Sequence, residues 1–142
     1  MRINLLKKAI FVQKYGTYTN EMVVIAGVTD KKEVFRYLKK IKAKPKFSKW
    51  LLENFDDWTD CLKNKNKGLF CYNDIIGEGT VLLLRSPDDS WEYWEVLMHE
   101  IHHTVQHLAK TKMMFEEVEA QAYLFEFLFH SIRRKLRGVD KI

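Results

Sequence analysis

Residues 99–103 read His-Glu-Ile-His-His and contain the pattern H-E-x-x-H. On an α-helix, the four-residue spacing of His99 and His103 places both imidazoles on one face, about one turn apart. Two imidazole nitrogens on one face can bind a single metal ion, and zinc is the ion that this pattern usually binds. Glu100 follows the first histidine, where its carboxylate can reach a metal-bound water and act as general base. The spacing therefore predicts a catalytic zinc site, with Glu100 facing a solvent-filled cavity.

The residues around this motif predict the helix that it needs. Apolar residues recur at three- and four-residue steps and would form one buried stripe: Trp94, Leu97, Ile101, Val105 and Leu108. The preceding Ser86-Pro87-Asp88-Asp89 is typical of a helix start, with a capping side chain, an early proline and two acids. We expect a helix from about Asp88 to Lys110. The alternative interpretation is a solvated, histidine-rich helix face that binds no metal.

Two histidines do not complete a catalytic zinc site, which usually has three protein ligands and one open position. A last helix is expected from about Glu116 to Leu136, and its start carries Glu116, Glu117 and Glu119. A short connection favours antiparallel packing against the motif helix, which would turn these carboxylates toward the histidines. Acids at a helix start also favour the positive end of the helix dipole, which explains Glu116. Glu117 and Glu119 both stay candidates for the third ligand.

H-E-x-x-H followed by Glu119-Ala120-Gln121-Ala122-Tyr123 resembles the zincin metallopeptidases that use a glutamate as third ligand. Within them the chain is most similar to small zincin-like proteins, many of them encoded by phages. The resemblance covers about residues 69–129. It implies that His99, His103 and Glu119 bind zinc and that Glu100 is the base.

A second zincin pattern, E-x-x-A-D, would make Glu117 the ligand instead. Gln121 stands where that pattern has its aspartate, so we prefer Glu119. Tyr123 lies one turn beyond Glu119 and, like His102, is a candidate to stabilise the oxyanion. His107 continues the four-residue series, but three histidines along one straight helix do not converge easily on one tetrahedral ion.

The rest of the chain predicts an α+β fold in one domain over residues 1–142, with a small antiparallel or mixed sheet followed by two packed helices that carry the metal site. Before the motif helix we expect a short helix running into a strand over Leu5–Lys14, and a second strand over Glu21–Ala26. A helix should follow, opened by Asp30 and Glu33 as a capping box and stopped by Pro45. Next come a helix over Phe47–Leu62 and a hairpin of Leu69–Tyr72 with Thr80–Arg85.

The composition is that of a globular protein, with 46% apolar and 13% aromatic residues among 142. Two cysteines, Cys61 and Cys71, give no disulfide framework, and we expect free thiols in a reducing cytoplasm. No apolar stretch approaches transmembrane length, and the N-terminus does not resemble a signal peptide. We therefore expect a cytoplasmic protein with no membrane partner.

The net charge of +5 is concentrated in residues 39–49, 63–67 and 133–141. We interpret these clusters as a solvated surface, because no aromatic stacking pattern or known nucleic-acid motif accompanies them. The alternative is that they bind nucleic acid or an acidic partner.

Two functions fit these observations. The first is a zinc-dependent peptidase, whose peptide or protein substrate would add along a sheet edge; we expect that edge to be the strand Thr80–Arg85. The second is a catalytically idle zincin-like metal-binding protein that acts through a protein or nucleic-acid partner. Glu100 favours the first, because a purely structural zinc site needs no base.

Overall fold

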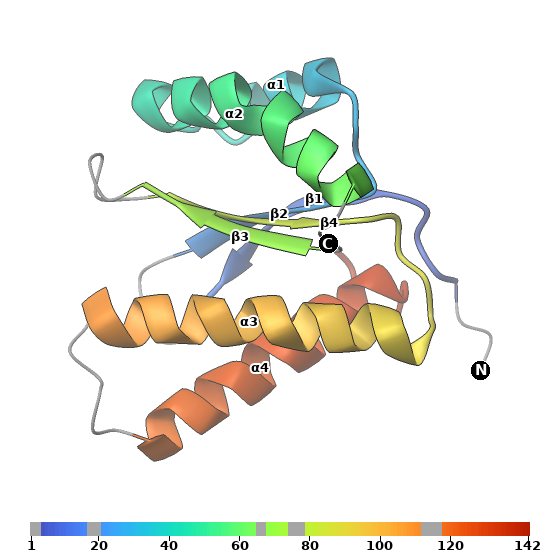
Figure 1. Cartoon of the computed structure of the whole chain (residues 1–142), viewed down its shortest axis with the longest axis vertical. Coiled ribbons are helices and arrows are strands. Elements are labelled where there is room, and N and C mark those ends of the chain that lie inside the picture. The colour runs from blue at the N-terminus through green and yellow to red at the C-terminus, as the bar shows by residue number, and fades with distance from the viewer. Residues whose placement is uncertain (1–3, 17–20, 65–67, 74–78, 112–117) are drawn as a thin grey trace.

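The computed structural model describes residues 4–16, 21–64, 68–73, 79–111 and 118–142. A four-stranded sheet lies between two pairs of helices (Figure 1), which confirms the α+β class. The elements are β1 (Ala9–Lys14), β2 (Glu21–Ala26), α1 (Lys31–Lys40), α2 (Pro45–Asn64), β3 (Gly68–Tyr72), β4 (Thr80–Leu84), α3 (Trp91–Thr111) and α4 (Val118–Leu136). No helix among the described residues is long and apolar enough to cross a membrane.

The sheet has the strand order β1-β2-β4-β3 and is mixed. The outer pairs β1–β2 and β3–β4 are antiparallel, so the predicted hairpin is confirmed, whereas β2 and β4 are parallel. The chain connects this parallel pair through α1, α2 and the edge strand β3. The prediction that Thr80–Arg85 forms the sheet edge was therefore wrong, because β4 pairs on both sides.

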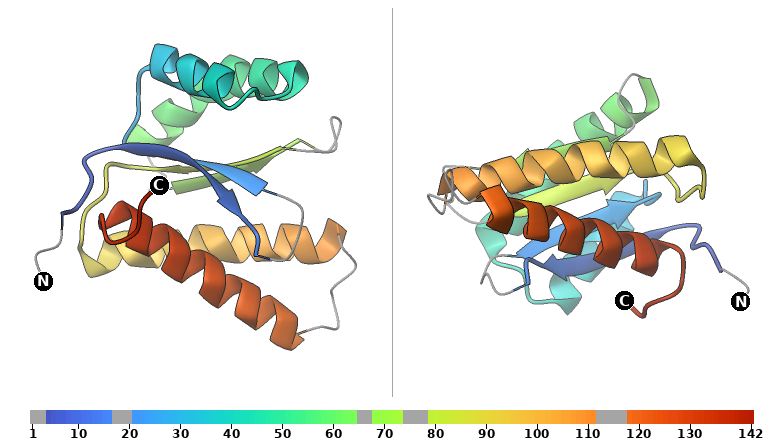
Figure 2. Two further views of the ribbon diagram at one scale, coloured as in Figure 1. Left: turned by 180° about the vertical axis from the view of Figure 1, so that it is seen from behind. Right: turned by 90° about the horizontal axis from the view of Figure 1, so that it is seen from below.

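Helices cover both faces of the sheet, with α1 and α2 on one and α3 and α4 on the other (Figures 1 and 2). This explains why the central strands are continuously apolar rather than alternating. In β2, for example, Met22 and Val24 contribute to the core beneath α3 and α4, while Val23 and Ile25 contribute to the core beneath α1 and α2.

The first helix begins as predicted and ends differently. The Asp30 carboxylate accepts a hydrogen bond from the Lys32 amide at 2.9 Å, which confirms the N-cap. The Glu33 carboxylate accepts from Lys8 Nζ at 2.7 Å rather than completing a capping box. Pro45 does not stop α1, which ends at Lys40; proline instead opens α2, at the helix position that tolerates its missing N–H. At the N-terminus the strand is confirmed, whereas no helix forms over residues 4–8.

The motif lies inside α3, and the predicted stripe of five apolar residues is buried along its length. The helix begins at Trp91, three residues later than expected, because Ser90 provides the cap: its hydroxyl accepts from the Tyr93 amide at 3.2 Å. The last helix, α4, is confirmed from Val118 onward, and Glu116 lies outside the described residues.

The two C-terminal helices pack against each other and run in opposite directions (Figure 1). They cover different halves of one sheet face: α3 packs on β3, and α4 packs on β1 at the opposite edge. The motif helix therefore lies at the free edge of the sheet, while α4 extends away from that edge (Figure 2).

Candidate metal centre

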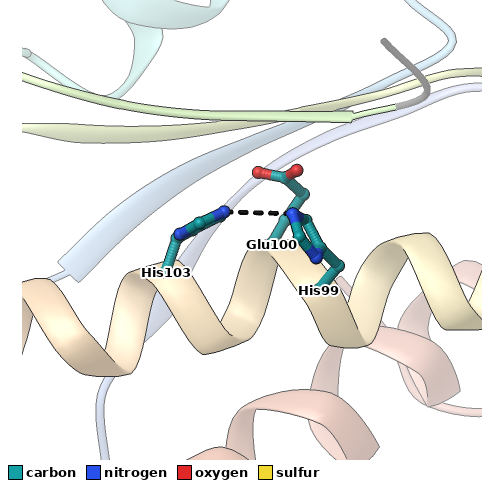
Figure 3. A group of neighbouring side chains, drawn as sticks. All are labelled: His99, Glu100 and His103. Atoms are coloured by element: carbon teal, nitrogen blue, oxygen red, sulfur yellow. Dashed lines mark hydrogen bonds between the residues drawn. The ribbon is translucent and has the colours of Figure 1, made fainter.

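His99 and His103 meet on the exposed side of α3, as the four-residue spacing predicts (Figure 3). Their Nε2 atoms are 3.1 Å apart, and the ring centroids are 4.6 Å apart with the rings nearly perpendicular, at 88°. Zinc–imidazole bonds are about 2.0–2.1 Å long, so one ion can contact both nitrogens at this separation. The two imidazoles could therefore hold a metal ion between them.

Glu100 belongs to the same cluster. Ligand atoms of His99, Glu100 and His103 all lie within 4.8 Å of one another. Among the described residues, these three side chains form the one group that could hold a metal ion. The carboxylate points from α3 toward the sheet (Figure 3), where it accepts a hydrogen bond from the backbone N–H of Phe70 in β3.

Glu100 is nevertheless buried, with 7% of its surface exposed, so the expectation that it faces a solvent-filled cavity was wrong. Desolvation raises the pKa of its carboxyl, while the neighbouring His103 and His99 and the Phe70 N–H oppose that rise. The packing of β3 against α3 closes the space over the carboxylate, a long-range contact that local sequence cannot reveal.

Gly68 allows this close approach of strand and helix. A Cβ atom at this position would lie 2.9 Å from Val96 Cγ1 and 3.0 Å from Glu100 Cγ. Real Cβ atoms essentially never come closer than 3.0 Å to another heavy atom, so a larger residue here forces the Val96 side chain, the Glu100 side chain or the strand itself to shift. This role of Gly68 was not predicted, because a glycine before a strand looks like an ordinary turn residue.

We expect Gly68→Ala to destabilise the protein by about 1–3 kcal/mol, the usual cost of overpacking. Thermal unfolding measures the loss. Adding Val96→Ala removes one of the two clashing atoms, so the double variant should be more stable than the sum of the single changes predicts. Strict additivity would show that Gly68 does not set the distance between α3 and β3.

A groove of about 340 Å³ begins beside the histidine pair and extends along the edge of the sheet. Its walls are Phe70 and Tyr72 from β3 and His103, Gln106, His107 and Lys110 from α3. The ring of His107 stacks on Tyr72, with centroids 4.2 Å apart, and meets Phe70 edge-on at 5.7 Å. His107 is thus part of the groove wall and not of the metal-binding group.

The position of Phe70 and Tyr72 in the groove wall was not predicted from the sequence. The alternation of side chains along β3 could have revealed it. Leu69 and Cys71 pack toward α1 and α2, so Phe70 and Tyr72 face α3.

The residues predicted on α4 are not brought to the histidine pair. Glu119 is exposed in the first turn of α4 and is not among the residues of the metal-binding group. Tyr123 is 64% exposed and does not line the groove. The physical reason is that α4 packs toward β1, whereas the histidines lie near β3. Glu117 lies outside the described residues, and the third ligand stays a prediction.

Comparison of the chain with protein-family models, curated proteins and solved structures finds no match. The three side chains and the groove beside them are therefore the observations that bear on function.

Proposed function

We propose that this chain is a zinc-dependent metallohydrolase, most simply a peptidase, with His99 and His103 as zinc ligands and Glu100 as general base. The observation that carries the proposal is the geometry of the cluster: two Nε2 atoms 3.1 Å apart with a carboxylate within 4.8 Å of both. Glu119 is our preferred third ligand, and Tyr123 the candidate to stabilise the oxyanion; both would require α4 to approach the histidines.

Zinc bound there would polarise the scissile carbonyl and make water acidic enough to attack it near neutral pH. The two imidazoles would hold the ion as neutral donors. Glu100 would take a proton from the attacking water and pass it to the leaving amine. Its hydrogen bond from the Phe70 N–H would fix the direction of the carboxylate during both transfers.

The substrate would be an extended peptide lying along the free edge of β3. An edge strand offers unpaired backbone groups that an added strand can bond, and here that edge runs beside the histidine pair, with the Phe70 N–H already donated to Glu100. The groove from His103 toward Lys110 would receive a substrate side chain against the rings of Phe70 and Tyr72. Its aromatic walls favour an apolar or aromatic residue.

A second function, metal binding without catalysis, is favoured by one observation. Glu100 is 7% exposed and already bonded to a backbone amide, which suits a carboxylate that orients the site rather than one that exchanges protons. In that case the protein would act through a partner, and its groove would bind the partner without cleaving it.

Incubation of the zinc-loaded protein with an unbiased peptide library, read by mass spectrometry, separates the two functions. We expect cleavage that stops when a chelator removes zinc and returns when zinc is restored. The products should share an apolar residue at one position near the cut, set by the groove. Absence of cleavage from a library that a known zinc peptidase digests under the same conditions would reject the hydrolase.

A further inference from the structure

The second half of α1, the turn that follows it and the start of α2 carry a dense positive charge. Residues 34–52 contain seven basic residues and no acidic residue, and all seven are exposed. We call these residues the basic corner: Arg36, Lys39, Lys40, Lys42, Lys44, Lys46 and Lys49. Lys49 also lies 3.9 Å from the Glu53 carboxylate, in an exposed pair that contributes little. The corner therefore presents a field that favours an anionic partner.

One of these lysines occupies a position that suits glycine better. The amides of Lys42 and Ala43 donate to the carbonyls of Lys39 and Leu38, at 3.1 and 3.0 Å, which closes α1 in a Schellman motif. The residue after the cap of such a motif adopts a left-handed conformation, and Lys42 has φ +54°. A lysine there costs stability relative to glycine and adds one more charge to the corner.

The corner also holds an exposed aromatic ring. Phe35 is 45% exposed on α1, and Lys39 Nζ lies 4.8 Å from the centre of its ring. Among the described residues of α1 and α2, Phe35 is the one large apolar side chain that is exposed. An exposed ring with a lysine against it provides a stacking surface for a base beside a contact for the neighbouring phosphate.

We propose that the basic corner binds single-stranded nucleic acid, with its lysines on the phosphates and Phe35 stacked on a base. Lysines act as point charges, so the binding would depend on the backbone and not on the base sequence. A membrane surface fits less well, because one exposed ring buries too little apolar area for stable insertion. An acidic peptide would match the charge but not the exposed ring. This binding does not depend on the proposed hydrolysis.

Fluorescence anisotropy with a labelled 20-nucleotide oligothymidine tests the proposal on the full chain. We expect binding that weakens steeply as salt rises from 50 to 200 mM. The triple variant K39Q/K42Q/K46Q should bind at least tenfold more weakly. The slope of log affinity against log salt should be smaller in magnitude by about two, because three phosphate contacts are lost and each contact on a single strand contributes about 0.7 to the slope.

The matched control is K7Q/K63Q/K141Q, which lowers the net charge equally at three exposed lysines outside the corner. It should lose little affinity. Phe35→Ala should weaken binding at least fivefold without changing the salt dependence, since stacking is not ionic.

Lys42→Gly separates binding from folding. Glycine relieves the left-handed strain, so the melting temperature should rise by about 2–4 °C while affinity for the oligonucleotide falls. A variant that is more stable yet binds less tightly cannot be explained by misfolding.

Three results would overturn the proposal. The first is no oligonucleotide binding at 50 mM salt and 100 µM protein. The second is an equal loss of affinity in the corner variant and the control variant. The third is tighter binding to vesicles containing phosphatidylserine, or to polyglutamate, than to the oligonucleotide; these would assign the corner to a membrane or to an acidic protein.

Discussion

The His103→Ala variant should lose tight zinc binding. Its affinity for zinc should fall by well over 10- to 100-fold, which is the loss caused by changing a residue that only supports a metal ligand. His103 supplies one of the two nitrogens that lie 3.1 Å apart, and one remaining imidazole does not hold zinc tightly. His99→Ala should behave in the same way. Titration against a fluorescent zinc indicator measures the effect.

The matched controls are His102→Ala and His130→Ala, two exposed histidines outside the metal-binding group. Both should keep the wild-type affinity. Zinc at a hundred times its Kd should stabilise the wild type by about 2.7 kcal/mol, a rise in Tm of roughly 5–10 °C, and should leave His103→Ala unchanged. Equal zinc affinity in His103→Ala and the controls would remove His103 from the site.

The Glu100→Gln variant should retain zinc but lose two to four orders of magnitude in hydrolysis, about 3–5 kcal/mol of barrier. The amide has nearly the shape of the carboxylate, yet it cannot take a proton from water. Its oxygen can still accept the hydrogen bond from the Phe70 N–H, so the carboxamide should keep its place beneath β3. Single-turnover cleavage of a peptide identified from the library measures the loss.

The stability of Glu100→Gln should equal or exceed that of the wild type. Glu100 is buried and desolvation raises the pKa of its carboxyl, so the native state bears a cost that a neutral amide avoids. Glu95→Gln is the matched control, because Glu95 is exposed on the same helix. Unchanged cleavage in Glu100→Gln would assign the proton transfers to another group, and lower stability would mean that the buried carboxylate contributes favourably to folding.

Local patterns predicted the histidine pair well. The four-residue spacing, the buried stripe along α3 and the apolar runs of β2 and β4 all depend on neighbours in the chain, and the structure confirms each of them. The Asp30 cap is equally local, since its carboxylate bonds an amide two residues away.

Features that depend on long-range packing could not be predicted. The parallel pairing of β2 with β4 places β3 at the edge, and no residue pattern in β4 reveals whether it pairs on one side or both. The burial of Glu100 follows from this arrangement, because β3 covers its carboxylate. The same topology sets α4 over β1, so the direction in which Glu119 would face was not predictable from helix spacing.

Anomalous diffraction at the zinc edge, from crystals of the protein grown with zinc, tests the metal centre most directly. We predict one strong peak about 2.0–2.1 Å from Nε2 of both His99 and His103, with a carboxylate of Glu119 or Glu117 as a further ligand and Glu100 beside the ion without binding it. No peak between the two imidazoles at full zinc loading, or a peak held by other residues, would contradict the assignment of this site.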